Sequence, residues 1–193
     1  ENFLTYQEVD ALSRITITSS RVTATAMLDG DDQIYAYYDK GAAYFNGNFV
    51  HFLTISLTAS QQGGARGIFW GMTNDLDDFQ GLINASKSGL FLYVTHSQSP
   101  NVKRLQLAEL DSGTFYNETG GAGYDISTGS VYYLKFVRDE TVGTYGTFYC
   151  YIYSNAARTT LLATMSITLH TSAKDYQYIM PMQSYDATAD AAK

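Results

Sequence analysis

The chain has 193 residues, a net charge of −7, 16% charged residues and 15% aromatic residues, including 17 tyrosines. This composition indicates a folded chain, because disordered segments carry many charges and few aromatic side chains. The densest basic cluster is the pair Lys103 and Arg104, so we expect no nucleic-acid partner, whose phosphates need a basic footprint. We also expect no membrane insertion, because no run approaches the ~20 apolar residues of a spanning helix.

Predicted strands follow one another through the first half of the chain. Residues 14–18 (RITIT) and 21–27 (RVTATAM) alternate apolar with polar side chains, which is typical of strands with one buried and one exposed face. Further strands are expected at residues 33–38, 49–58 and 67–72. Apolar residues at adjacent positions in the last of these (GIFWGM) indicate a strand that is covered on both faces.

The second half of the chain continues this pattern. A helical turn is expected at residues 76–84, and strands are expected at residues 90–96, 102–110 and 114–117. The stretch 131–170 predicts three strands joined by two polar turns, because β-branched and aromatic residues alternate with clusters of Asp, Gly, Ser and Asn. Cys150, the only cysteine, excludes an internal disulfide and is expected to be a small buried residue. A last strand is expected at residues 176–183, where Pro181 indicates an edge or terminal position.

About a dozen predicted strands and almost no helix indicate an all-β fold. Two antiparallel sheets packed face to face would bury one face of each strand. We therefore expect a two-sheet antiparallel β-sandwich (jelly roll), with one domain over residues 1–193 because no linker divides the chain. The sequence begins at Glu1 without a methionine, and we interpret it as a processed form or an excised fragment.

Four stretches carry a resemblance to a known superfamily. They are TYQEVD at 5–10, RITITSSRVTATAM at 14–27, YYDKGAAYFNGNFVHFLTISLT at 37–58, and the stretch 131–170, in which CYIYSNAARTTLLATMSITLH is the most specific piece. Their order resembles the concanavalin A-like (laminin G-like) jelly-roll domains of phage, viral and bacterial surface proteins. The resemblance implies a sandwich of about a dozen strands at an extracellular or virion surface. The chain ends near the position where such domains usually form a closing strand. We therefore expect either a complete domain or one that lacks this strand at its C-terminal boundary.

This resemblance does not imply one activity, because such domains act as lectins, adhesion modules, decoration modules or glycoside hydrolases. Catalytic members carry their carboxylates on one strand as E-x-D-x-x-E. The nearest match here is Glu8 with Asp10, and the third carboxylate is missing. Glycoside hydrolysis needs a pair of carboxylates that flank the scissile bond. We therefore predict that the chain is not an enzyme, with glycoside hydrolase as a weak alternative.

The candidate ligand site lies around the only tryptophan. Trp70, Asn74 and Asp75 would combine an aromatic platform with planar polar groups, as sugar sites do. Asn74, Asp75, Asp77 and Asp78 offer the oxygen ligands that calcium prefers, so calcium is a candidate cofactor, although none is required. In the alternative interpretation, Trp70 is a core residue and the acids solvate a turn.

A second acidic cluster precedes the strand at residues 33–38. It consists of Asp29, Asp31 and Asp32. Neither this cluster nor the first one matches the EF-hand loop. The same two interpretations apply to it, a calcium site or solvated acids in a turn.

Three tyrosines in the stretch 147–153 share one face of a predicted strand. Tyr149, Tyr151 and Tyr153 alternate with Phe148, Cys150 and Ile152. An exposed tyrosine face would suit a glycan or a protein partner, and a hydrogen-bonded layer inside the sandwich fits the pattern equally well. We predict a non-catalytic, lectin-like module that binds glycan or a neighbouring virion or surface protein. The alternative is a purely structural decoration or assembly module without a ligand.

Overall fold

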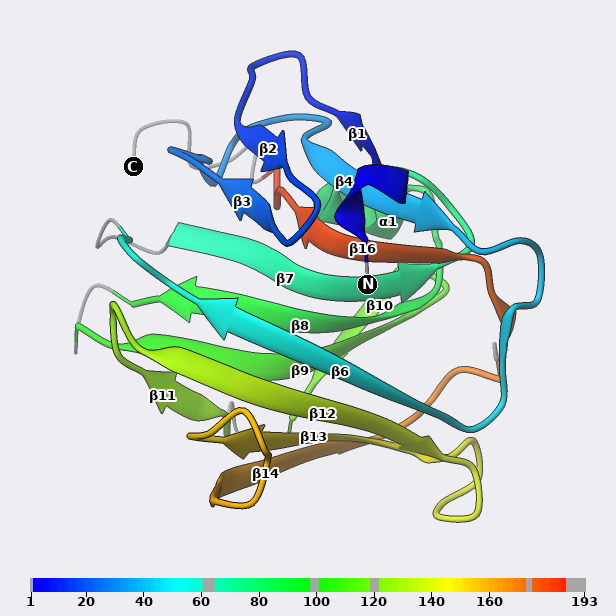
Figure 1. Cartoon of the computed structure of the whole chain (residues 1–193). Coiled ribbons are helices and arrows are strands. Elements are labelled where there is room, and N and C mark those ends of the chain that lie inside the picture. Colours follow the sequence, from blue (N-terminus) through cyan, green and yellow to red (C-terminus); the bar gives the residue numbers. More distant parts are fainter. Residues whose placement is uncertain (1, 61–64, 98–100, 119–121, 173–174, 187–193) are drawn as a thin grey trace.

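The computed structural model describes residues 2–60, 65–97, 101–118, 122–172 and 175–186, and these residues form an all-β fold (Figure 1). Strands account for 51% of the structure and helices for 5%, which confirms the expected fold class.

Two antiparallel sheets form the sandwich. The larger sheet has eight strands, in the order β1 (Gln7–Val9), β4 (Tyr35–Asp39), β16 (Tyr178–Gln183), β7 (Ala65–Thr73), β8 (Gly89–His96), β9 (Lys103–Asp111) and β10 (Thr114–Asn117), with β11 (Tyr124–Ile126) also paired with β9. The smaller sheet has four strands, in the order β14 (Leu161–Thr168), β13 (Thr147–Tyr153), β12 (Val131–Asp139) and β6 (Phe49–Ser56). Ten of the predicted strands lie in these two sheets, which also contain β1 and β11, two short strands that the sequence did not indicate.

Four further strands form two short pairs outside these sheets. They are β2 (Ile15–Ile17) with β3 (Val22–Ala24), and β5 (Phe45–Asn46) with β15 (Asp175–Tyr176). A single 3-10 turn, η1 (Phe3–Thr5), precedes β1 in the described part of the chain. Figure 1 shows β1, β2 and β3 at one end of the larger sheet, with β6 crossing in front of β8 and β9.

The core lies between the two sheets. Burial alternates residue by residue along β12, which turns Leu134 and Phe136 inward, as the period of two in a strand requires. Phe136 and Phe148 of the smaller sheet stack on Trp70 of the larger sheet, at ring-centroid distances of 4.4 and 5.5 Å. Cys150 is fully buried in the same core, as predicted.

The strand β7 is covered on both faces, which confirms the prediction made from GIFWGM. Trp70 faces the core between the sheets, whereas Ile68 packs with Phe79 and Leu82 on the opposite side. The latter two belong to α1 (Phe79–Asn84), the helical turn expected in this region. No helix among the described residues is both long and apolar enough to cross a membrane.

The position predicted for the last strand is wrong. Instead of lying at an edge, β16 pairs with β4 on one side and β7 on the other. Proline cannot donate a ladder hydrogen bond, and the ladder with β4 accommodates this by a register shift between Ile179 and Met182. Pro181 lies within that irregularity, so a β-bulge replaces the edge position that proline usually requires.

Candidate functional site

The residues of the predicted ligand site have different roles in the structure, and Trp70 is a core residue. Its side chain is 1% exposed, and its Nε1 donates a hydrogen bond to Nδ1 of His51 over 3.0 Å. The ring packs on Phe136 and Phe148 of the opposite sheet. The prediction of an exposed aromatic platform at Trp70 is therefore wrong, because packing this large ring between the sheets buries more apolar surface than a turn could.

Asn74 and Asp75 contact other segments of the protein. Oδ1 of Asn74 accepts a hydrogen bond from the backbone N–H of Gln177 at 2.9 Å, and its Nδ2 donates to the carbonyl of Asp175 at 2.5 Å. Asp75 forms an ion pair of 2.7 Å with Lys87. Both residues therefore hold chain segments together at one end of β7, and their role in ligand binding stays a prediction.

Asp77 and Asp78 are engaged at the start of α1. Asp78 is the N-cap: its Oδ1 accepts the N–H of Gly81 at 2.7 Å and its Oδ2 accepts the N–H of Gln33 at 3.1 Å. Oδ1 of Asp77 accepts a hydrogen bond from the side chain of Gln33 and another, of 2.9 Å, from the N–H of Asp78. This arrangement satisfies backbone donors that a helix start leaves open.

The fold brings together a different set of carboxylates. Oxygens of Asp32, Asp78 and Asp186 lie within 4.8 Å of one another, so the group takes one residue from each predicted acidic cluster and a third from the end of the described chain. Asp75 and Asp77 are not in it. Burial raises the pKa of Asp78 to about 6, and the charge of Asp77 adds to that rise, against two backbone hydrogen bonds that lower it.

The other two acids of the second cluster are not solvated turn residues. Asp29 pairs with Arg66 at 2.9 Å and Asp31 pairs with Arg14 at 3.1 Å, and both carboxylates are buried. The interpretation of these two residues as exposed turn acids is wrong, because each neutralises an arginine that packs beside it.

Glu8 and Asp10, the nearest match to a catalytic carboxylate pair, have different surroundings. Both oxygens of Asp10 accept backbone N–H groups, from Arg14 at 2.8 Å and Ile15 at 2.6 Å. Glu8 is exposed on β1, the last strand of the larger sheet. Asp10 therefore holds a turn.

The strand register of the smaller sheet decides which way its tyrosines point. Phe148, Cys150 and Ile152 are buried in the core, so the residues that alternate with them face outward. The outward positions lie in three adjacent rows across the sheet, which we call the tyrosine face: Val50, Val137, Tyr149 and Ser166; Phe52, Lys135, Tyr151 and Thr164; and Thr54, Tyr133, Tyr153 and Leu161. Of the two interpretations that the sequence left open, the outward one is confirmed.

Aromatic rings and two basic side chains are close neighbours on the tyrosine face. The rings of Tyr149 and Tyr151 are stacked, with centroids 6.1 Å apart and planes 20° apart. Nζ of Lys135 lies 5.6 Å from the centroid of Tyr151. The guanidinium of Arg158 lies 4.7 Å from the centroid of Phe52, a cation–π distance.

Arg158 reaches this face from the turn between β13 and β14. Oδ1 of Asn155 accepts the N–H groups of Thr159 and Thr160 at 3.1 and 3.0 Å, which closes the turn. Arg158 adopts a φ of +54° within it, in the left-handed region that non-glycine residues seldom occupy. Its Nε then donates to the carbonyl of Leu134 at 3.2 Å, so the cation is fixed over β12 and β6.

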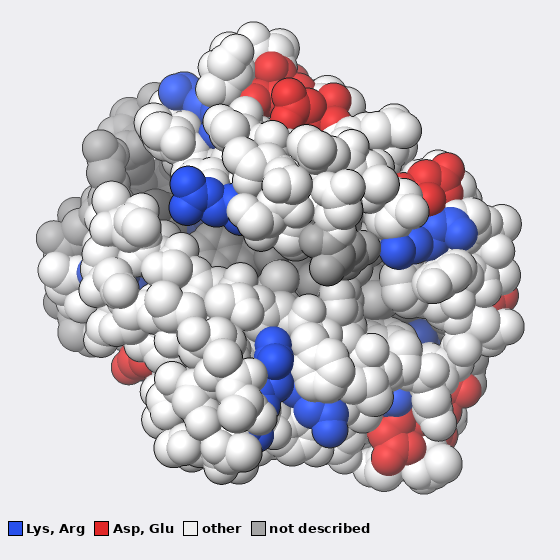
Figure 2. Space-filling view, in the orientation of Figure 1, with Lys and Arg blue, Asp and Glu red and all other residues white. Residues whose placement is uncertain are grey.

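The tyrosine face lacks acidic residues and carries exposed apolar side chains. Its three rows contain no carboxylate in a chain of net charge −7. Val50, Phe52 and Leu161 are 55%, 54% and 52% exposed. Figure 2 views the side on which β6 and β12 lie in front, where basic atoms occur amid uncharged surface and acidic atoms lie toward the outline. Val50 and Phe52 are neighbours on the outer face of β6, whereas Leu161 lies on β14 at the opposite edge of the sheet.

Sequence reasoning missed Phe52, Lys135 and Arg158 as members of this surface. The alternation of residues 49–56 and 131–139 shows which residues share a face. It does not show that β6 and β12 are neighbours, nor that a turn between β13 and β14 returns over them. To find these three residues, the sequence would have had to show both that the tyrosines face outward and in which order the strands lie.

In comparisons with known proteins, the chain matches no family model, no curated protein and no solved structure.

Proposed function

We propose that this chain is a non-catalytic, surface-displayed β-sandwich module of the concanavalin A-like (laminin G-like) type, whose tyrosine face binds glycan. The observation that carries the proposal is that Tyr149, Tyr151 and Tyr153 face outward along β13, with the cations of Lys135 and Arg158 nearby. The all-β sandwich and the sequence resemblance support the type of module. The resemblance alone supports an extracellular or virion-surface location.

The tyrosine face offers the two kinds of contact that sugars need. Ring faces of Tyr149 and Tyr151 can stack on the apolar C–H faces of a pyranose. Lys135, Thr164 and Ser166 stand in the same two rows and can bond hydroxyl groups. All five side chains belong to β12, β13 and β14, whose backbones are held in the sheet. Little backbone entropy is therefore lost on binding.

The absence of carboxylates from this face supports a binding role without hydrolysis. Glycoside hydrolases place two carboxyl groups about 5–9.5 Å apart across the bond that they cleave. None of the twelve side chains in the three rows is Asp or Glu. A sugar bound to these rows would therefore not meet the pair of carboxyl groups that such hydrolysis uses.

We expect Tyr151→Ala to weaken retention on the glycan that the wild-type chain binds, by about tenfold, because a stacking ring at the centre of the face is lost. The ligand is first identified on a glycan array, and affinity is then measured by calorimetry. Tyr145→Ala is the matched control, since Tyr145 is 39% exposed in the turn between β12 and β13, outside the three rows. Equal affinities of the two variants, or no glycan bound by the wild type, would refute the proposal.

We expect EDTA to leave glycan retention unchanged. The tyrosine face carries no carboxylate ligand, and the carboxylates of Asp32, Asp78 and Asp186 belong to elements at the larger sheet. The measurement compares array binding in millimolar calcium with binding in EDTA. A loss of binding on chelation would move the ligand site from the smaller sheet to the carboxylate group.

A neighbouring protein is the second candidate ligand for the same surface. The half-exposed apolar side chains Val50 and Phe52 of β6 favour it, because the centre of a protein interface is rich in aromatic and other apolar residues. Sedimentation velocity of the isolated chain separates the two candidates. Self-association that Phe52→Glu abolishes, without glycan binding, would favour the assembly role.

A further inference from the structure

We propose that the free edge of β6 accepts an extended, acidic segment of a partner protein as an added strand. This site uses the edge of the smaller sheet, whereas the glycan site uses its outer face. The two surfaces adjoin and share Val50, Phe52, Thr54 and Arg158.

The edge itself is the first observation. From Phe49 to Ser56, β6 pairs with β12 along one side, and it is the last strand of the four-stranded sheet. No strand among the described residues pairs with its other side. Natural proteins usually cover or blunt such edges, because a row of backbone donors and acceptors is a template for another chain.

A groove runs along this edge. Two adjoining hollows, of about 330 and 410 Å³, share His51 and Ile179 as lining residues. Between them they are lined by every residue of β6, from Phe49 to Ser56. Inward-facing and outward-facing residues alternate along a strand, so a space that touches all of them lies against the strand's backbone.

The floor of the groove is apolar and its far wall is a hairpin. Phe69, Trp70, Ile179 and Met182 line the floor from the larger sheet, and Arg21 and Val22 line the wall from β3 and the turn before it. A strand laid beside β6 would therefore direct every second side chain onto an apolar floor.

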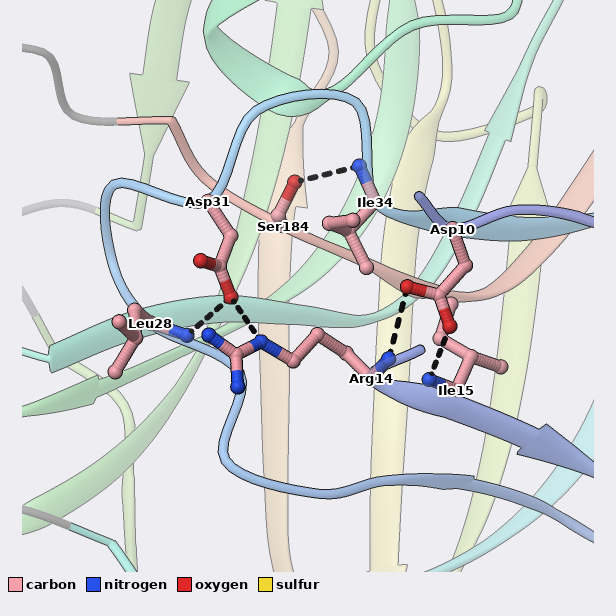
Figure 3. A network of polar contacts seen from close by, with 7 residues as sticks. All are labelled: Asp10, Arg14, Ile15, Leu28, Asp31, Ile34 and Ser184. Atoms are coloured by element: carbon pink, nitrogen blue, oxygen red, sulfur yellow. Dashed lines mark hydrogen bonds and ion pairs between the residues drawn. The ribbon is translucent and has the colours of Figure 1, made fainter. Parts of the chain in front are cut away.

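The hairpin wall is held in place before any partner arrives. Asp10 accepts the N–H groups of Arg14 and Ile15 where β2 begins, and Arg14 pairs with Asp31 (Figure 3). Oδ2 of Asp31 also accepts the N–H of Leu28 at 2.8 Å, beyond the end of β3. Both ends of the hairpin are thus fixed, and a preorganised groove reduces the entropy lost on binding.

Charge selects the partner. Among the described residues, the lining of the two hollows includes Arg21, Lys40 and Arg158 and no carboxylate, although the whole chain carries a net charge of −7. Figure 2 shows the hollow across the middle of this face, with basic atoms on both sides of it. Electrostatic complementarity therefore favours an acidic segment. The eight residues of β6 set its length, and the pleat of a strand sets its pattern: apolar and acidic residues in alternation.

The test uses an eight-residue peptide in which Val and Glu alternate, with a Val/Lys peptide of equal length as the charge control. Trp70 is the only tryptophan and lies in the floor, so its fluorescence reports occupancy. Amide hydrogen exchange reports the ladder: the peptide should protect backbone amides within Phe49–Ser56. Methylation of alternate peptide nitrogens, tried in both registers, should abolish binding in the register that removes the donors facing β6.

Arg21→Glu should weaken the Val/Glu peptide by about tenfold, while the matched charge reversal Lys103→Glu on β9 should not. The proposal is overturned if the Val/Glu peptide does not bind at about 1 mM, if it binds without protecting β6, or if both methylated forms bind as well as the parent. It is equally overturned if polygalacturonate, an acidic glycan, shifts Trp70 fluorescence and the peptide does not. The glycan array on the tyrosine face is read separately, so either proposal can fail alone.

Discussion

Glu109→Ala should lower the free energy of unfolding by about 3–5 kcal/mol. The carboxylate of Glu109, in β9, is 0% exposed. It accepts the backbone N–H of His170 at 2.9 Å and that of Thr171 at 2.8 Å, and Nδ1 of His170 lies 3.0 Å away. Alanine would leave the backbone N–H groups of His170 and Thr171 without their acceptor, and each unsatisfied buried donor costs about 1–3 kcal/mol.

The contacts of Glu109 also explain why the loss should be large for the whole domain. The segment that it holds follows β14 of the smaller sheet, while Glu109 belongs to the larger sheet. The carboxylate therefore ties the two sheets at one end of the sandwich. Because a domain of this kind has only about 5–15 kcal/mol of stability, the variant would unfold at a much lower urea concentration.

Urea unfolding followed by circular dichroism measures this effect. Glu8→Ala is the matched control, because Glu8 is exposed on an edge strand and its loss should change stability by less than about 0.5 kcal/mol. Glu109→Gln should fall between the two, since it keeps one acceptor oxygen. A Glu109→Ala variant as stable as Glu8→Ala would show that water replaces the carboxylate.

Glu118→Gln should stabilise the protein at pH 8 by about 2–3 kcal/mol and have little effect near pH 4.5. Glu118 is 5% exposed and follows β10, with its Oε1 accepting the N–H of Leu107 at 3.2 Å. Its Oε2 is buried and has no hydrogen-bond partner among the described residues. Burial raises the pKa of Glu118 from 4.5 to about 7, against the single hydrogen bond from Leu107, which lowers it.

The sign follows from proton binding. Between pH 4.5 and about 7 the folded chain holds a proton on Glu118 that the unfolded chain has released. The free energy of unfolding therefore falls as the pH rises through this window, and the loss is complete above the folded pKa. Glutamine resembles the protonated form, so it removes the loss at high pH and changes little at low pH.

Chemical denaturation of wild type and Glu118→Gln at a series of pH values measures the difference curve. Asp78, whose pKa is raised to about 6, adds a slope of the same sign to both proteins and cancels in the difference. A difference that does not change between pH 4.5 and 8 would mean that Glu118 is ionised and solvated in the folded state.

The sequence by itself determined the strands and the fold class. Alternation in residues 131–139 and 147–153 marks β12 and β13, and unbroken apolar residues in GIFWGM mark a strand covered on both faces. These signals are local, because a strand's period of two and its covering depend on residues a few positions apart. Short strands such as β5 and β15 were not predicted, because two residues are too few to show the alternation of a strand.

Only the tertiary structure decided which face of each strand lies inside. The pattern of Tyr149 to Ile152 is the same whether the tyrosines or their neighbours are buried, and the choice depends on what the opposite sheet presents. Trp70 completes the core against Phe136 and Phe148, so the apolar rings of β12 and β13 turn inward. The tyrosines are left outside, together with Phe52 from the neighbouring β6.

Only the tertiary structure likewise decided which polar groups meet. Asp77 and Asp78 are adjacent in the chain and both accept a hydrogen bond from the side chain of Gln33, yet only Asp78 joins Asp32 and Asp186. Carboxylates from distant segments converge where those segments pack, which the sequence of one turn does not show. The groove beside β6 has the same origin: no residue in it signals an unpaired edge, because an edge is a property of strand order and not of any strand's own sequence.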